Sequence, residues 1–199
     1  KPTMLASRIY TSAKRANKIV TDLLDFTRSQ SGSGIPLHRV DANLAEVCEG
    51  MVEEVRAYNP ERQITYDTSG NLTGLFDASR MEQVFSNMIS NAVQHGSKTG
   101  AIRVGMHAEQ AHAVFTVHNQ GEPIAKDAIA DIFNPMSRHS QYAAGEHGPH
   151  SGLGLGLYIA SEIVAAHKGT IVVESTAELG TTFTVKLPLA AHASRRATD

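Results

Sequence analysis

The stretch SGLGLGLYIASEIVAAHK, residues 151–168, places three alternating glycines at the start of an amphipathic helix. Glycine weakens a helix or strand around it, so this pattern favours a backbone that must come close to something else. The N–H groups of Gly152, Gly154 and Gly156 can approach an anion, and the amino end of a helix favours negative charge. The stretch therefore predicts a phosphate site at the mouth of a helix over residues 153–167. A tight turn would also use alternating glycines, so other segments must decide.

Residues 81–95, MEQVFSNMISNAVQH, form a second informative segment. Its apolar residues recur at helical spacing, and Asn87 and Asn91 lie four positions apart at the edge of that stripe. Asparagine is a poor residue for the interior of a helix. The pair is either two surface amides or a means of holding a hydrated magnesium ion against phosphate oxygens, for which neutral oxygen ligands are suited.

The third segment is VHNQGEPI, residues 117–124. A strand ends at Asn119, Gly121 opens a turn, and Pro123 stiffens the exit from it. The side-chain carbonyl of Asn119 can accept a hydrogen bond from an adenine amino group, with Gly121 keeping the wall of the site thin. By itself, this segment indicates only a turn.

These segments, in this order and spacing, resemble the nucleotide-binding motifs of sensor histidine kinases. The catalytic domains of that family share a fold with the ATPase domains of type II topoisomerases, MutL proteins and the ninety-kilodalton heat-shock chaperones. Residues 81–95 resemble the N box, 117–124 the first glycine box, and IFNP at 132–135 the phenylalanine box. GLGLGL at 152–157 resembles the second glycine box, and GTTF at 180–183 the closing glycine-threonine motif.

The resemblance covers nearly the whole chain and implies binding of ATP with Mg²⁺ under a mobile lid, residues 134–151. It implies the Bergerat-type fold, which is of the α+β class. In this two-layer α/β sandwich a mixed, mostly antiparallel sheet lies under helices, and here one long helix precedes it. The order of elements favours the same class, because helices and strands mix without strict βαβ alternation.

Carried over by position, the resemblance implies that Asn91 ligates magnesium, that Asn87 lies beside it on the phosphate side, and that Asn119 binds adenine. It also implies that Phe133 packs beside the lid, that Thr181 or Thr182 reaches adenine through water, and that Arg138 contacts phosphate. The full set of implied ATP-binding residues is Asn87, Asn91, His95, Asn119, Gly121, Phe133, Arg138, Gly152, Leu153, Gly154, Leu155, Gly156, Leu157, Thr181 and Thr182.

Residues 3–29 form a long predicted helix that ends in DLLDFTR and resembles the second helix of a dimerisation hairpin. Its apolar or small residues repeat in steps of four and three, as in a coiled-coil seam. The helix packs either on its own domain or against other helices, including those of a second copy, and the length of the stripe favours the latter. The seam comprises Leu5, Ile9, Ser12, Ala16, Ile19, Leu23 and Phe26.

Residues 1–31 are therefore interpreted as the hairpin helix, 32–190 as the ATP-binding domain and 191–199 as a flexible tail. Periodicity and turn residues divide the second of these further. The predicted strands are 35–40, 62–68, 102–108, 113–118, 170–175 and 181–187, and the predicted helices are 44–58, 77–95, 125–133 and 153–167.

The composition limits the class of protein. The chain has 199 residues, 19% of them charged, with a net charge of −2, which does not suggest a partner such as nucleic acid. A single cysteine, Cys48, excludes an internal disulfide and suggests a reducing compartment. No apolar run is long enough to span a membrane. We expect a cytoplasmic fragment without membrane contact, although its parent can carry an anchor elsewhere.

Three departures from the family pattern bear on function. Asparagine stands at position 119 where the family usually has aspartate, and Gln94 replaces a common lysine. None of the ten histidines lies in a phosphoacceptor context, and His139, His147 and His150 in the lid are interpreted as solvated rather than as a metal site. The expected function is transfer of the γ-phosphoryl group of ATP to a histidine outside this sequence. Relay to a response regulator receiver domain and homodimerisation of the parent follow from the resemblance. The alternative is a degenerate nucleotide-binding or dimerisation module without kinase activity.

Overall fold

The computed structural model describes residues 2–32, 34–135 and 154–189. Its centre is a five-stranded sheet with the strand order β2-β4-β5-β7-β6. β2 and β4 run parallel, whereas the other neighbouring pairs are antiparallel. A separate two-stranded sheet pairs β1 with β3. The strands are β1 (Val40–Asn43), β2 (Ile64–Ser69), β3 (Thr73–Phe76), β4 (Ile102–Glu109), β5 (His112–Asn119), β6 (Thr170–Thr176) and β7 (Gly180–Pro188).

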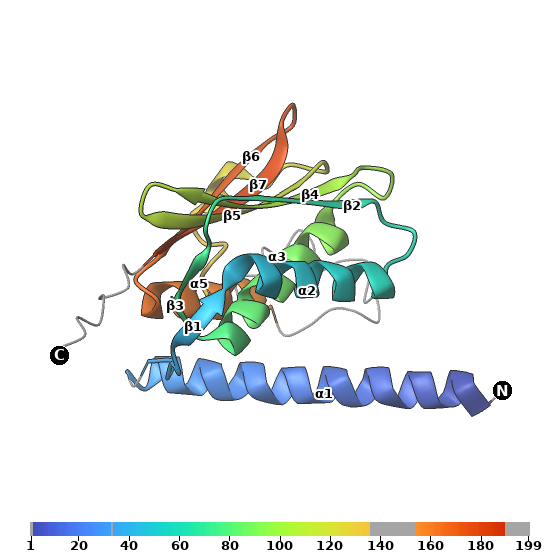
Figure 1. Cartoon of the computed structure of the whole chain (residues 1–199). Helices are drawn as coiled ribbons and strands as arrows, with labels where there is room; N and C mark the ends of the chain where they lie inside the picture. Colours follow the sequence, from blue (N-terminus) through green and yellow to red (C-terminus); the bar gives the residue numbers. More distant parts are fainter. Residues whose placement is uncertain (1, 33, 136–153, 190–199) are drawn as a thin grey trace.

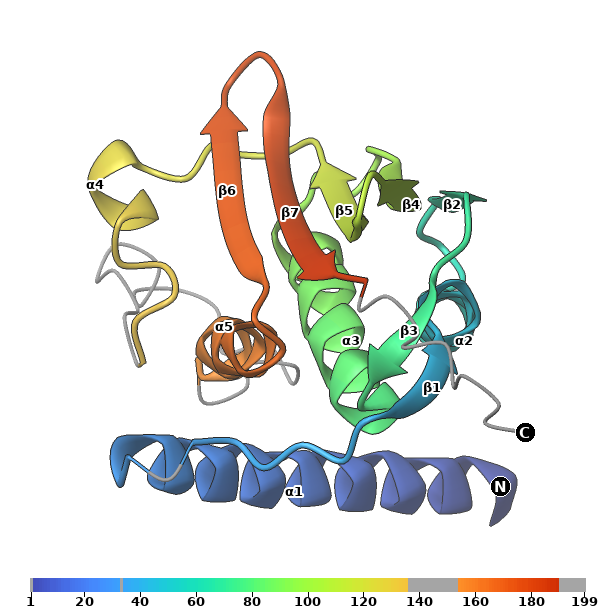
Figure 2. The same cartoon turned by 60° about the vertical axis from the view of Figure 1, so that its left-hand side comes forward.

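Helices α2, α3 and α5 cover one face of the large sheet, and α1 lies on the far side of this helical layer (Figures 1 and 2). This arrangement confirms the predicted fold class, a two-layer α+β sandwich preceded by one long helix. The described helices are α1 (Pro2–Gln30), α2 (Leu44–Tyr58), α3 (Ala78–His95), α4 (Lys126–Ile129) and α5 (Gly156–Ala166).

α3 lies at the centre of the helical layer because its apolar stripe is continuous and fully buried. The ring of Phe85 lies 4.8 Å from that of Phe115 on β5, which joins the helix to the middle of the sheet. The carboxylate of Asp77 accepts a hydrogen bond from the Arg80 N–H at 3.2 Å and caps the first turn. Asp77 is therefore the N-cap of α3. The buried stripe comprises Met81, Val84, Phe85, Met88, Ile89 and Ala92.

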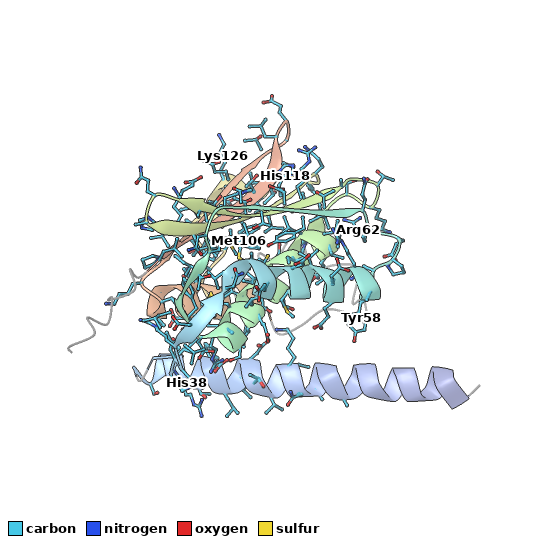
Figure 3. The ribbon with its side chains drawn as sticks, viewed as in Figure 1. His38, Tyr58, Arg62, Met106, His118 and Lys126 are labelled. Carbon is cyan, nitrogen blue, oxygen red and sulfur yellow. The ribbon has the colours of Figure 1, made fainter. Side chains whose placement is uncertain are left out.

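Strand alternation decides which side chains reach the helical layer. On β5, Phe115, Val117 and Asn119 are buried toward the helices, while the residues between them face the other way. Figure 3 shows Met106 of β4 between the sheet and the helices, and His118 of β5 on the opposite side of the sheet. A residue of the predicted adenine site that lies on β5 therefore reaches the helical layer only if it occupies a buried position of this strand, as Asn119 does.

Three predicted boundaries were wrong, and one strand was not predicted. No strand forms over residues 35–39, because β1 begins at Val40, and β3 was not predicted at all. These short strands pair only with each other, and their sequence carries little alternation. The predicted helix 125–133 is limited to α4, four residues long. α5 begins at Gly156 rather than at residue 153, because Gly154 adopts a left-handed backbone with φ of 74°.

The C-terminal half of α1 packs on its own domain, which is the alternative that the seam did not favour. The Asp25 carboxylate lies 2.6 Å and 3.1 Å from the two terminal guanidinium nitrogens of Arg80, and Phe26 meets Tyr158 edge-to-face at 5.8 Å. Leu23 belongs to the same predicted seam but is 47% exposed, so the seam is not one continuous contact surface. In the three described segments, no helix has the length and apolar character of a membrane span.

His167, which follows α5, is a buried residue that stabilises the start of α3. Its Nε2 accepts the N–H of Asp77 at 3.1 Å, and its Nδ1 lies 2.9 Å from the carbonyl of Ile163. This pattern needs a neutral ring, with the proton on Nδ1. Burial lowers the pKa of His167, opposed in part by the Ile163 carbonyl.

We expect this histidine to make folding sensitive to mild acid. Since its pKa is lower in the folded state, the unfolded chain binds the extra proton first, and stability falls as the pH drops below about 6.5, the unperturbed value. His167→Gln, which cannot titrate, should flatten the dependence of the free energy of unfolding on pH below about 6.5. Denaturant titrations at several pH values measure this slope. An unchanged slope would contradict the prediction, and exposed His112→Gln is the matched control.

Candidate functional site

The C-terminal end of α3 lies against the loop that leaves β5. Gly96 and Gly121 form an isolated antiparallel bridge, and the N–H of Ser97 donates to the carbonyl of Gln120 at 2.5 Å. A Cβ on Gly121 would lie 2.8 Å from the carbonyl oxygen of His95, closer than real Cβ atoms approach backbone. The predicted N box and first glycine box are therefore in direct contact, and glycine at 121 is required by this close approach.

Asn119 lies at the end of β5, between its partners Ile102 on β4 and Thr181 on β7. The residue is only 4% exposed. Its amide nitrogen donates to the carbonyl of Gln120 at 3.4 Å, and its side-chain oxygen accepts no hydrogen bond from the described residues. This oxygen is therefore available to accept a hydrogen bond from a bound molecule.

The closing motif on β7 divides between the two faces of the sheet. The hydroxyl of Thr181 is buried and lies 2.7 Å from the hydroxyl of Ser175, which also accepts the N–H of Ile124 at 2.9 Å. The hydroxyl of Thr182 instead lies 3.0 Å from Nδ1 of His118, on the outer face. The structure therefore brings Thr181 to Asn119 and leaves Thr182 on the other side.

Phe133, from the predicted phenylalanine box, packs on the inner face of β7. Its ring meets that of Phe183 edge-to-face, with the centroids 6.3 Å apart. Phe183 follows Thr181 by two positions, so both point toward the same side of the sheet. Phe133 thus closes the β7 side of the site. Of the remaining predicted residues, Arg138, Gly152 and Leu153, together with most of the predicted lid, lie outside the described residues.

Asn87 joins α3 to the amino end of α5. Its amide nitrogen donates to the carbonyl of Gly156 at 3.0 Å, and its side-chain oxygen accepts from Nζ of Lys18 at 2.7 Å. A Cβ on Gly156 would lie 3.4 Å from the Asn87 amide carbon, an ordinary van der Waals contact. Asn91, one turn further along α3, is half-buried and has no hydrogen-bond partner among the described residues.

The amino end of α5 presents backbone donors next to Asn87. The first helical bond of α5 joins the N–H of Ile159 to the carbonyl of Leu155 at 2.8 Å, so the N–H groups before it have no helical acceptor. Leu155 itself is buried in the core, and Leu157 packs against it. Free donors and the helix dipole together suit an anion.

α3 connects the two ends of the site. Asn87 marks the α5 end, and the carbonyl of His95 touches Gly121 at the Asn119 end. Eight residues of helix separate them, a rise of about 12 Å. An acceptor for a base and donors for phosphates therefore lie at opposite ends of one helix. Burial lowers the pKa of His95, which favours a neutral ring beside the base end.

Two residues near the site were not predicted. Lys18 reaches Asn87 from α1, and Arg62 donates from Nη1 to the carbonyl of Ser97 at 2.6 Å. Nε and Nη2 of Arg62 are buried without a partner in the described part of the chain. No spacing could have revealed either residue, because both approach from elements distant in the sequence. A hollow lined by Glu109, Gln110, His112 and Lys186 lies at the opposite end of β5 from Asn119 and takes no part in the site.

Comparison with known families shows to which class of domain these elements belong. Residues 76–191 match the family described as histidine kinase-, DNA gyrase B- and HSP90-like ATPase. The chain belongs to this family. The match begins at the last residue of β3 and runs through β7, so it includes α3, Asn119 and the α5 entry, and it confirms the resemblance to the ATP-binding catalytic domain of histidine kinases.

Relatives agree with this assignment. The chain is 29% identical to a bacteriophytochrome of Pseudomonas aeruginosa, over 94% of this chain and 25% of that protein. It is 28% identical to the sensor histidine kinase RppB of Synechocystis, over 88% of this chain and 38% of that protein. The chain therefore spans well under half the length of these two relatives.

Solved structures show the same fold. The histidine kinase AdeS of Acinetobacter baumannii superposes with a TM-score of 0.70 at 20% identity, covering 94% of this chain and 85% of that one. Full-length ShkA in complex with AMPPNP superposes with a TM-score of 0.72 at 27% identity, covering 92% of this chain and 39% of that one.

Proposed function

We propose that this chain binds Mg-ATP along α3 and donates the γ-phosphoryl group to a histidine of a sensor kinase. The main observation behind the proposal is that α3 connects an acceptor for a base at one end with donors for phosphates at the other. At one end lies the Asn119 oxygen, which has no partner among the described residues, and at the other the first N–H groups of α5, which have no acceptor within their helix, follow the contact of Asn87 with Gly156. ShkA, which shares this fold, was solved with AMPPNP, an ATP analogue, and this supports the choice of nucleotide.

The residues present fit magnesium at Asn91. This side chain is half-buried, its carbonyl oxygen has no partner among the described residues, and it lies one turn from Asn87. Neutral oxygen ligands suit a magnesium ion that keeps several waters and bridges phosphate oxygens. Bound magnesium would neutralise phosphate charge, while Asn87 and the α5 backbone would orient the phosphates. Phosphoryl transfer depends mainly on such positioning and charge stabilisation.

The acceptor histidine is proposed to lie outside residues 1–199, with relay to a response regulator receiver domain in the cytoplasm. The parent is proposed to dimerise through α1, whose face away from the domain exposes Val20, Leu23 and Leu24. The domain limits 1–31, 32–190 and 191–199 remain part of this proposal. A four-helix bundle would bury such a face.

A single labelling experiment tests the kinase function. The chain is incubated with γ-labelled ATP, magnesium and a hairpin that carries the phosphoacceptor histidine, and then treated with acid and alkali. Acid-labile, alkali-stable label on the hairpin supports the proposal. Binding of Mg-ATP without any transfer would favour the degenerate module, which the uncharged acceptor Asn119 keeps as the second candidate.

The two neighbouring threonines provide a matched pair. Thr181→Val should weaken ATP binding about threefold to tenfold, because a water-mediated hydrogen bond contributes roughly 0.5–1.5 kcal/mol. Thr182→Val should have little effect, since its hydroxyl bonds to His118 on the outer face. Titration calorimetry with Mg-ATP measures both, and equal losses would contradict the assignment.

A further inference from the structure

The docked face of α1 is polar, which fixes how the helix lies on the domain. Asp22 and Asp25 are both buried, and Arg80 and Gln83 of α3 reach them from the domain. The Arg80–Asp25 pair is bidentate, with side chains 16% and 2% exposed. Breaking such a pair leaves an uncompensated buried charge, so alternative positions of α1 along α3 are disfavoured.

The last turn of α1 adds a second anchor on α5. The hydroxyl of Ser29 donates to Glu162, and the hydroxyl of Tyr158 donates to Ser29 at 2.8 Å. The two anchors lie on different helices of the domain. Together they determine the rotation of α1 as well as its position along its axis.

This fixed position places Lys18 at the α5 end of the nucleotide site. Nζ of Lys18 lies 2.7 Å from the side-chain oxygen of Asn87, and Asn87 in turn bonds to Gly156 at 3.0 Å. Asp22, one turn along α1, accepts from the same ammonium at 3.1 Å. A continuous chain of polar contacts therefore runs from α1 to the first residue of α5.

The ammonium of Lys18 has capacity left for a ligand. It carries three N–H donors, and its partners in the described part of the chain are Asp22 and Asn87. The side chain is 51% exposed, so a third donor can reach a molecule in the site. The first N–H groups of α5, which have no acceptor within the helix, begin at Gly156, the residue whose carbonyl binds Asn87. A cation and a helix amino end thus converge where phosphates are proposed to bind.

We infer that α1 completes the nucleotide site by supplying Lys18 as a phosphate-binding residue, so that docking of α1 and binding of Mg-ATP strengthen each other. This inference rests on the proposed function. If Lys18 contacts phosphate only from the docked helix, then nucleotide must favour docking by the same factor by which docking favours nucleotide. The family commonly has a lysine at the position of Gln94. The site of this chain lacks that basic residue, and Lys18 would supply one.

The first test measures the affinity of the 199-residue chain for Mg-ATP. Lys18→Met keeps the length of the side chain and removes the charge, and it should weaken binding about tenfold, as expected for a charge-assisted contact. Affinity for adenosine, which lacks phosphates, should not change. Lys186→Met, on the outer face beside Glu109, is the matched control and should bind normally.

The second test asks whether Lys18 acts from the docked helix. Asp25→Asn should loosen docking and weaken Mg-ATP binding, and adding Lys18→Met to it should cause little further loss. The double variant Asp25→Arg, Arg80→Asp exchanges the two charges and should recover part of the affinity for Mg-ATP that Asp25→Asn loses. In hydrogen exchange, Mg-ATP should protect the amides of residues 18–30, and Lys18→Met should remove that protection.

The outcomes separate the two proposals. If the wild-type chain binds Mg-ATP and Lys18→Met binds it equally or more tightly, the inference is wrong and the proposed function stands. Faster exchange in α1 on adding Mg-ATP would show that helix and nucleotide compete, which also overturns the inference. If the wild-type chain binds no adenine nucleotide, both proposals are overturned.

Discussion

Replacing Asn119 with alanine should weaken ATP binding by about 1–3 kcal/mol, the cost of losing a buried hydrogen bond, or about 5- to 150-fold. Asn119 is a buried residue whose side-chain oxygen accepts nothing from the described residues, and this oxygen is proposed to accept a hydrogen bond from the adenine amino group. Asn119→Asp should bind ATP more tightly than wild type, because a carboxylate makes a charge-assisted bond to the same donor.

The base itself supplies the control for this prediction. Inosine triphosphate carries a carbonyl in place of the amino group, so wild type should bind it weakly and Asn119→Ala should lower that affinity little. A substitution that merely loosens the end of β5 would weaken both nucleotides alike, and that result would remove Asn119 from base recognition. His118→Ala, one position earlier on the outer face, should leave the preference for adenine intact.

Asn91→Ala should weaken binding of Mg-ATP about tenfold or more, about 1.4 kcal/mol, and slow phosphoryl transfer further. Metal-free ATP should bind almost as it does to wild type, because the lost oxygen is proposed to ligate magnesium rather than the nucleotide. Titrations with and without a chelator measure the two affinities. Asn91 has no bonding partner in the described residues, so its removal disturbs no internal contact that the structure shows.

Two further variants on α3 serve as controls for this prediction. Ser90→Ala, at an exposed neighbouring position, should change neither affinity. Asn87→Ala should weaken nucleotide binding with or without metal, because it releases both Gly156 and Lys18. If Asn91→Ala lowers the two affinities by the same factor, Asn91 is not a metal ligand.

Most elements were predictable from local pattern. α2 and α3 match their predicted spans closely because each presents one continuous apolar stripe to a single neighbouring layer. The hairpin of β4 and β5 follows from alternation in both strands. β1 and β3 were missed or misplaced, since they pair only with each other at the edge of the fold and depend on contacts that local sequence does not describe.

The site was predictable in its residue types but less so in their roles. Asn119, Gly121 and the glycine entry of α5 lie at the ends of regular elements, where a turn or helix start has a recognisable composition. The sequence left Thr181 and Thr182 as alternatives. A shift of one residue in strand register exchanges the two faces of a sheet, and pairing with β5 put Thr181 inside.

The sequence by itself determined the family fold, the order of its nucleotide motifs and the amphipathic helices that carry them, because periodicity and turn chemistry are local properties. Tertiary structure alone decided that α1 packs on its own domain and that Asn87 binds Lys18 and Gly156. Lys18 and Asn87 are 69 positions apart, and the buried Asp25–Arg80 pair that brings them together joins residues 55 apart. Such contacts depend on how whole helices dock, since buried charges require partners that only the assembled layers can supply.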